Sequence, residues 1–271
     1  MDLPPELMDA VLLRLEPREF LWVMPAVSRG WRARVALLRY RKPLTTPAAV
    51  RLAALRAPHA ESVKLLEHSD KDAPRLLLAN FKSLRRLNVN ARMWLPESYA
   101  ALRQLLAAYD QLEELSVTTA WPLGLLALTA SAHPFYKSLR ALRLHVDATY
   151  AMMGVIPTAL IGLAAMAPNL AELLLRNVGL SAETLELLLD ACPKLATLHL
   201  LLWTNDTTPG CLAVLRERGR SLEDVVFTVR RTHALLDGQA GAVTLRKAYA
   251  KHALSMFGDC RRLRALTLRN V

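Results

Sequence analysis

The residues of this chain that could do covalent or metal chemistry are seven histidines and three cysteines. Metal sites and nucleophile–base pairs need ligands at characteristic spacings, and these residues are scattered without such a spacing. The histidines are His59, His68, His133, His145, His199, His233 and His252. Neither a glycine-rich phosphate loop nor a G-x-S-x-G or H-E-x-x-H motif occurs. The sequence therefore predicts no enzyme, no metal and no cofactor.

Binding chemistry is available instead from polar residues that alternate with leucine or valine in short segments, as in Leu142-Arg143-Leu144-His145. Arginine and protonated histidine form charge-assisted hydrogen bonds with carboxylates and phosphates. The pattern predicts an acidic or phosphorylated protein target, although the same charges would also suit a merely solvated surface. The residues predicted to contact the target are Arg86, Asn88, Arg143, His145, Glu172, Arg176 and His199.

The elements that position these residues are copies of one frame, L-x-x-L-x-L. Copies begin at Leu84, Leu112, Leu139, Leu170, Leu195, Leu222 and Leu263, and a degenerate copy begins at Ala60. Most copies follow one another at roughly 27 residues, which is typical of a leucine-rich repeat. A short strand turns alternate residues to one side, so the leucines form a buried row and the residues between them an exposed one.

Helices are predicted between the strands, over 96–108, over 181–191 with Ser181 as N-cap, and from Thr208 onward. We therefore expect an α/β fold over 60–271: a right-handed solenoid of about seven to eight repeats. Its parallel strands would lie on the concave face and its helices on the convex face. The longer last interval predicts an inserted loop over 231–243. No asparagine or cysteine stands three residues after the last strand leucine, so we expect no side-chain ladder between repeats.

The first 40 residues predict three short helices. Leu3, Pro4, Glu6 and Leu7 open the first, followed by Val11, Leu12 and Leu15; Val27, Ser28, Trp31 and Arg32 belong to the third. This pattern resembles an F-box, and an F-box followed by repeats resembles the F-box/leucine-rich-repeat proteins. The resemblance implies that Leu3, Pro4, Leu7, Val11, Leu12, Leu15, Val27 and Trp31 contact a Skp-type adaptor. Pro25 departs from the pattern and is predicted to kink or end the second helix.

That resemblance implies the substrate-recognition subunit of a Skp–cullin–F-box ubiquitin ligase, with the F-box at 1–40, a helical linker at 41–59 and the target held by the repeats. The alternative is a non-ligase scaffold whose helices cap the repeats. The two differ in whether Leu7, Val11, Leu12 and Leu15 are exposed or packed on the first repeat.

Net charge, uncharged stretches and the number of cysteines limit the kinds of partner and the cellular compartment that the sequence indicates. A net charge of +11 permits nucleic-acid contact, but the charge is scattered, and no nucleic-acid motif accompanies it. Two uncharged stretches, 148–171 and 115–136, approach the length of a membrane span, yet both contain proline and a repeat strand. Neither partner is favoured. Three cysteines indicate a reducing compartment, the cytoplasm or the nucleus. Cys192 and Cys260 share one position in the frame, which predicts small buried residues.

Overall fold

The computed structural model divides the chain into two compact units. The first comprises residues 1–118 and 130–139, and the second comprises 119–129 and 140–271. The described residues are 4–38, 40, 44, 47–57, 59–65, 81, 83–91, 96–119, 133–146, 155–178, 180–203, 208–218, 221–230 and 265–270. The predictions for Leu3, for Cys260 and for the 231–243 insertion lie outside them.

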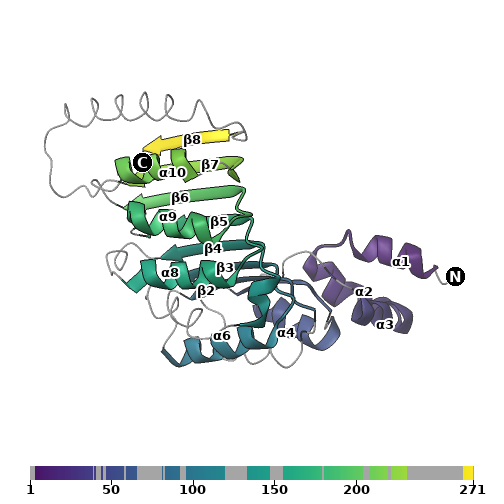
Figure 1. The fold of residues 1–271 in the computed structure, drawn as a ribbon. Coiled ribbons are helices and arrows are strands. Elements are labelled where there is room, and N and C mark those ends of the chain that lie inside the picture. The colour runs from purple at the N-terminus through teal and green to yellow at the C-terminus, as the bar shows by residue number, and fades with distance from the viewer. Residues whose placement is uncertain are drawn as a thin grey trace, which may run out of the picture. The chain divides into compact units, whose positions relative to one another are not determined.

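The second unit contains five parallel strands whose order in space is their order in the chain (Figure 1). They are β4 (Ala141–Val146), β5 (Glu172–Arg176), β6 (Thr197–Trp203), β7 (Asp224–Arg230) and β8 (Ala265–Asn270). Frame residues pair with frame residues: Leu142 lies beside Leu173, which lies beside Leu198. The frame residues of β4, β5 and β6, together with Val225 of β7, are buried, so the row that the frame predicts is continuous across these strands, each strand completing the core of the next.

Helices between these strands form the other layer of the second unit (Figure 1). They are α8 (Val155–Met166), α9 (Ala182–Ala191) and α10 (Thr208–Arg218), and α9 packs against both of its neighbours. As predicted, Ser181 caps α9: its hydroxyl accepts a hydrogen bond from the Thr184 amide at 3.1 Å. Strands and helices together make an α/β repeat fold.

The uncharged stretch 148–171 contains Pro157, which does not interrupt a helix but lies in the first turn of α8. Backbone amides in a first turn have no partner within the helix, so the missing N–H of proline costs nothing there. None of the described helices is long and apolar enough to cross a membrane.

The first unit carries strands β1 (Ser62–Leu65), β2 (Arg86–Ala91) and β3 (Glu114–Thr119), again in chain order. It also contains α4 (Pro47–Arg56), α6 (Pro96–Ala108) and the short 3-10 helix η2 (Pro134–Lys137). The helix predicted over 96–108 is confirmed. Leu44 forms a parallel bridge with Val63, and the Glu61 amide donates to the Tyr40 carbonyl at 2.8 Å. The segment that follows the N-terminal helices is thus hydrogen-bonded to the edge of β1.

Four short helical segments precede that edge: α1 (Pro5–Leu12), η1 (Glu19–Val23), α2 (Met24–Val27) and α3 (Arg29–Leu37). Their core consists of side chains with no accessible surface, namely Leu12, Phe20, Leu21, Val35 and Tyr40. The rings of Phe20 and Tyr40 stack at 4.1 Å between centroids. The Tyr40 hydroxyl donates to the Leu15 carbonyl at 2.9 Å, and burial raises the pKa of Tyr40. These segments therefore have an apolar centre of their own.

Pro25 lies inside the second helical stretch, which continues past it and ends at Val27. In an α-helix the Pro25 nitrogen would face the Leu21 carbonyl, but proline has no N–H to donate. The Arg56 guanidinium of α4 donates to that carbonyl instead, at 2.8 Å. Immediately upstream, η1 has the wider π-helical winding, in which the Met24 amide donates to the Glu19 carbonyl. Arg56 and this π-turn together accommodate the proline.

Candidate functional site

The N-terminal helices carry most of the exposed large apolar side chains. Among the described residues there are nine, and seven of these lie between Leu7 and Leu37. We call these seven the N-terminal apolar surface: Leu7, Val11, Leu13, Trp22, Val23, Val27 and Leu37. Leu7 and Val11 stand one helical turn apart on α1, as do Val23 and Val27 in the second stretch. Apolar surface concentrated on so small a unit is characteristic of a protein-docking site.

The described residues that were predicted to contact an adaptor differ in exposure: some are exposed, some are partly buried, and Leu12 is fully buried. Pro4, Leu7, Val11 and Val27 are exposed, with Val27 at 60%. Leu15 and Trp31 are partly buried.

The prediction for Leu12 is corrected, because this side chain has no accessible surface. α1 ends at Leu12 and the chain turns over the next three residues. The helical periodicity that groups Leu12 with Val11 does not extend beyond that point. Leu12 therefore belongs to the core of the helical segments and cannot face a partner in this conformation.

Sequence reasoning missed Trp22, which is 52% exposed. It stands in the run Phe20-Leu21-Trp22-Val23-Met24, where five successive apolar residues give no periodicity to read. The structure buries Phe20 and Leu21 and exposes Trp22 and Val23. An exposed tryptophan at a docking surface is the residue type that most often dominates binding energy.

The second candidate surface is the exposed strand face of the second unit, where the predicted Arg143, His145, Glu172, Arg176 and His199 all lie. Four are partly buried, and Arg176 is exposed. The Arg143 Nε atom donates to Glu172 Oε1 at 2.8 Å, and His199 Nε2 lies 3.3 Å from Asp224 Oδ2. Both pairs connect neighbouring strands, so much of the charge on this face is neutralised within the protein.

Asn177, another residue that sequence reasoning missed, ties three repeats together just beyond β5. Its Nδ2 atom donates to the Val146 carbonyl at 3.1 Å and lies 3.3 Å from His145 Nε2. Its backbone amide donates to the Leu201 carbonyl at 2.7 Å. Asn177 is buried and has a φ of 57°, a left-handed conformation that asparagine tolerates better than most residues. The position at which a ladder asparagine was looked for is Val178, so Asn177 bonds the turn backbone of this repeat from one residue earlier.

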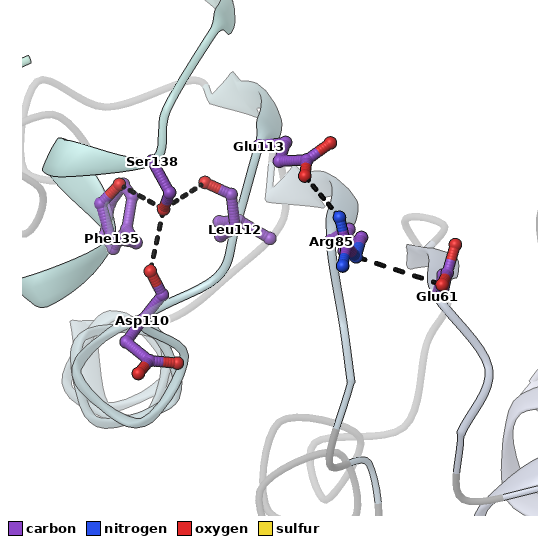
Figure 2. Close-up of polar contacts among 7 residues, drawn as sticks. All are labelled: Glu61, Arg85, Asp110, Leu112, Glu113, Phe135 and Ser138. Atoms are coloured by element: carbon purple, nitrogen blue, oxygen red, sulfur yellow. Dashed lines mark hydrogen bonds and ion pairs between the residues drawn. The ribbon is translucent and has the colours of Figure 1, made fainter. Parts of the chain in front are cut away.

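In the first unit, the residues just before each strand form a polar ladder (Figure 2). Arg85 lies between two acids, with Nη1 2.5 Å from Glu113 Oε1 and Nε 3.8 Å from Glu61 Oε1. The backbone repeats the same connection, because the amides of Arg85 and Arg86 both donate to the Glu61 carbonyl at 2.9 Å. Ser138 Oγ lies 2.7 Å from the Asp110 carbonyl and 3.1 Å from that of Leu112. These contacts stabilise the stacking of the repeats.

The two predicted contact residues of the first unit lie beyond this ladder. Arg86 and Asn88 are partly buried on β2, beside Ser62 and Lys64 of β1. They share the side of the strand opposite to the buried Leu87 and Val89. The first unit therefore presents predicted contact residues on its own strand face.

The buried thiols offer no reactive site. Cys192 is 1% exposed and Cys211 is fully buried, and burial raises the pKa of each thiol to about 11. A thiol with so high a pKa is protonated near neutral pH and is a poor nucleophile. The prediction that Cys192 is a small buried residue is confirmed. Within the described part of the chain, no group of histidine, cysteine, aspartate and glutamate side chains could hold a metal ion.

Comparisons with known proteins identify the family to which the repeats are similar. The family model described as "FBD-associated F-box protein At5g56370, LRR repeats" matches residues 100–264. No curated protein matches the chain. Among solved structures, a chain in the crystal structure of the yeast Rad7 and Elc1 complex aligns over 97% of this chain and 81% of its own. Its sequence identity is 12% and its TM-score 0.42.

Proposed function

The chain belongs to the family of leucine-rich repeats found in FBD-associated F-box proteins, and on that premise we propose that it is a substrate receptor of a Skp–cullin–F-box ubiquitin ligase. The N-terminal helices would act as the F-box and bind a Skp-type adaptor, which connects to a cullin. The repeats would form a solenoid whose exposed strand face holds the target. The receptor would contribute no catalytic group and would raise the local concentration of target near the ubiquitin carrier.

The observation that carries this proposal is the N-terminal apolar surface. The helical segments already have a core in Leu12, Phe20, Leu21, Val35 and Tyr40. The exposed apolar residues are therefore additional to what folding requires, and their burial against a partner would be favourable. Each large apolar side chain transferred from water contributes roughly 1.5–3 kcal/mol.

A scaffold role is favoured by a different observation. Tyr40 and Leu44 extend the hydrogen bonding of β1, so the segment behind the N-terminal helices covers the edge of the first strand. A cap of this kind needs no adaptor. Capping uses Tyr40, Leu44 and the buried core, however, and leaves the apolar surface unexplained.

The test is an adaptor-binding measurement on the full chain. Leu7→Asp/Val27→Asp places two charges on the apolar surface without touching the core, and we expect affinity for a purified Skp-type adaptor to fall more than about tenfold. Leu187→Asp is the matched control, because Leu187 is a 45% exposed leucine on α9, far along the chain. It should bind as wild type does. Wild-type chain that is folded by circular dichroism yet does not bind the adaptor would leave the scaffold role.

A further inference from the structure

On the exposed strand face of the second unit, charged side chains that already have an ion-pair partner lie next to apolar side chains that are only partly buried. Register places Arg176 beside His145 on one side and beside Leu201 on the other. Leu174 precedes Arg176 on the same face of β5 and lies beside His199, which lies beside Val226. Leu174, Leu201 and Val226 are only partly buried, although most repeats place polar residues at these positions.

The cations on this face differ in what they can offer a ligand. Arg143 is held by Glu172 at 2.8 Å, and His199 lies against Asp224 at 3.3 Å. His145 Nε2 lies against the Asn177 amide, whose Nδ2 donates to a backbone carbonyl and so must also be the donor here. His145 Nε2 is therefore the acceptor of this contact and offers a ligand no hydrogen-bond donor.

Arg176 is the exception. It is exposed, and it has no hydrogen-bond or ion-pair partner among the residues that the structure describes. Its guanidinium is fully charged at neutral pH and has donors arranged to grip a carboxylate through two parallel hydrogen bonds. Arg176 lies beside Leu201 and follows Leu174 on the same face of β5. Among the described residues, this face can therefore bind an anion at Arg176 and an apolar side chain directly next to it.

We propose that this face binds an extended segment of the target protein that presents an aspartate or glutamate carboxylate to Arg176. A neighbouring aliphatic side chain of the segment packs on Leu174 and Leu201. A carboxylate fits better than a phosphoryl group, because a phosphoserine carries nearly two negative charges and is usually held by a cluster of arginines. The inference deepens the proposed function, since the segment is the recognition element of the ligase target.

The experiment selects peptides of about twelve residues, long enough to cross several strands, from a random display library against the full chain. We expect the enriched peptides to carry an acidic residue close to an aliphatic one. In synthetic form they should bind Arg176→Gln at least about tenfold more weakly than wild type, a loss typical of a charged hydrogen-bonded pair. Leu201→Ser tests the apolar contact and should weaken the same peptides.

Arg140→Gln is the matched control, because Arg140 is an exposed arginine of the same unit that stands just before β4, outside the strand face. It should change peptide affinity by less than about threefold. Three outcomes overturn the proposal: no peptide enriches, enriched peptides bind Arg176→Gln as well as wild type, or replacing the acidic residue by phosphoserine tightens binding. Adaptor affinity is measured on wild type and on Arg176→Gln, and it should be equal in the two. A wild type that binds the selected peptides but not the adaptor would remove the ligase role alone, and a wild type that binds the adaptor but selects no peptide would remove the strand-face proposal alone.

Discussion

Arg56 and Pro25 form an unusual pair whose energetic coupling can be predicted. Pro25 deprives the Leu21 carbonyl of its helical donor, and Arg56 Nη1 supplies a donor at 2.8 Å from another helix. Arg56→Met keeps the aliphatic stem and removes that donor. Leu21 is fully buried, so its carbonyl would lose a partner away from water, at a cost of about 1–3 kcal/mol.

Pro25→Ala should reduce this cost, because alanine brings back an N–H that can donate to the Leu21 carbonyl. In that background Arg56→Met would leave the carbonyl with a partner. We therefore expect the two substitutions to be non-additive by about 1 kcal/mol, with the double variant more stable than the sum of the single effects implies.

Urea unfolding of the four proteins measures this coupling. Replacing Trp94, Trp121 and Trp203 by phenylalanine leaves Trp22 and Trp31, so that fluorescence reports on the N-terminal helices. Arg103→Met is the control, since Arg103 is an exposed arginine on α6, and it should change stability by less than about 0.5 kcal/mol. Additivity of the two effects, or an Arg56→Met cost no larger than that of the control, would refute the reasoning.

Further predictions concern the second unit. A Cβ on Gly210 would lie 2.9 Å from the Ala182 Cβ, whereas a Cβ on Gly162 meets nothing within 4 Å. Gly210→Ala should therefore lower the melting temperature through overpacking, and Gly162→Ala should raise stability by about 0.5–1 kcal/mol. Asn177→Gly allows the same left-handed backbone but removes the side-chain hydrogen bonds, so the free energy of unfolding should fall by about 1 kcal/mol. Asn177→Ala should lower it by about 1 kcal/mol more, because a Cβ disfavours the left-handed conformation; urea unfolding measures both. Because burial raises the pKa of Cys192 and Cys211 from 9.0 to about 11, the stability that these thiols contribute is fully present below pH 9. It is lost as pH rises through about 11. Thermal unfolding from pH 7 to 11 should accordingly show a steeper alkaline decline in wild type than in the Cys192→Ala/Cys211→Ala variant, and equal slopes would contradict it.

The strands were predictable because their signal is local. Each of the eight frame copies, from Ala60 to Leu263, carries a strand in the structure, and the paired strands align frame residue with frame residue. A buried row at alternate positions fixes which side of a strand faces the helices, and a slip by one residue would expose every leucine. Periodicity and register therefore agree without information from elsewhere in the chain.

The pairing of charges on the strand face was not predictable in the same way. Arg143 and Glu172 stand 29 residues apart, and His199 and Asp224 stand 25 apart. Each contact runs diagonally, because register places Ala141 beside Glu172 and Thr197 beside Asp224. A diagonal contact depends on side-chain conformation as well as on strand order. The sequence thus indicated which residues share the face but not which of them are already paired.

In the N-terminal helices, which side chains are buried does not follow α-helical periodicity, because the backbone of η1 is wound differently. A π-turn places more residues in each turn than an α-helix, so residues around η1 are displaced relative to an α-helical face. Phe20 and Leu21 consequently lie in the core, and Trp22 and Val23 face outward. A cap would gain nothing from holding a half-exposed tryptophan in water, since the transfer of that ring into an apolar environment is favourable. The outward Trp22 is therefore better explained by a partner than by capping, and Trp22→Ala should weaken adaptor binding while leaving the buried core of these helices intact.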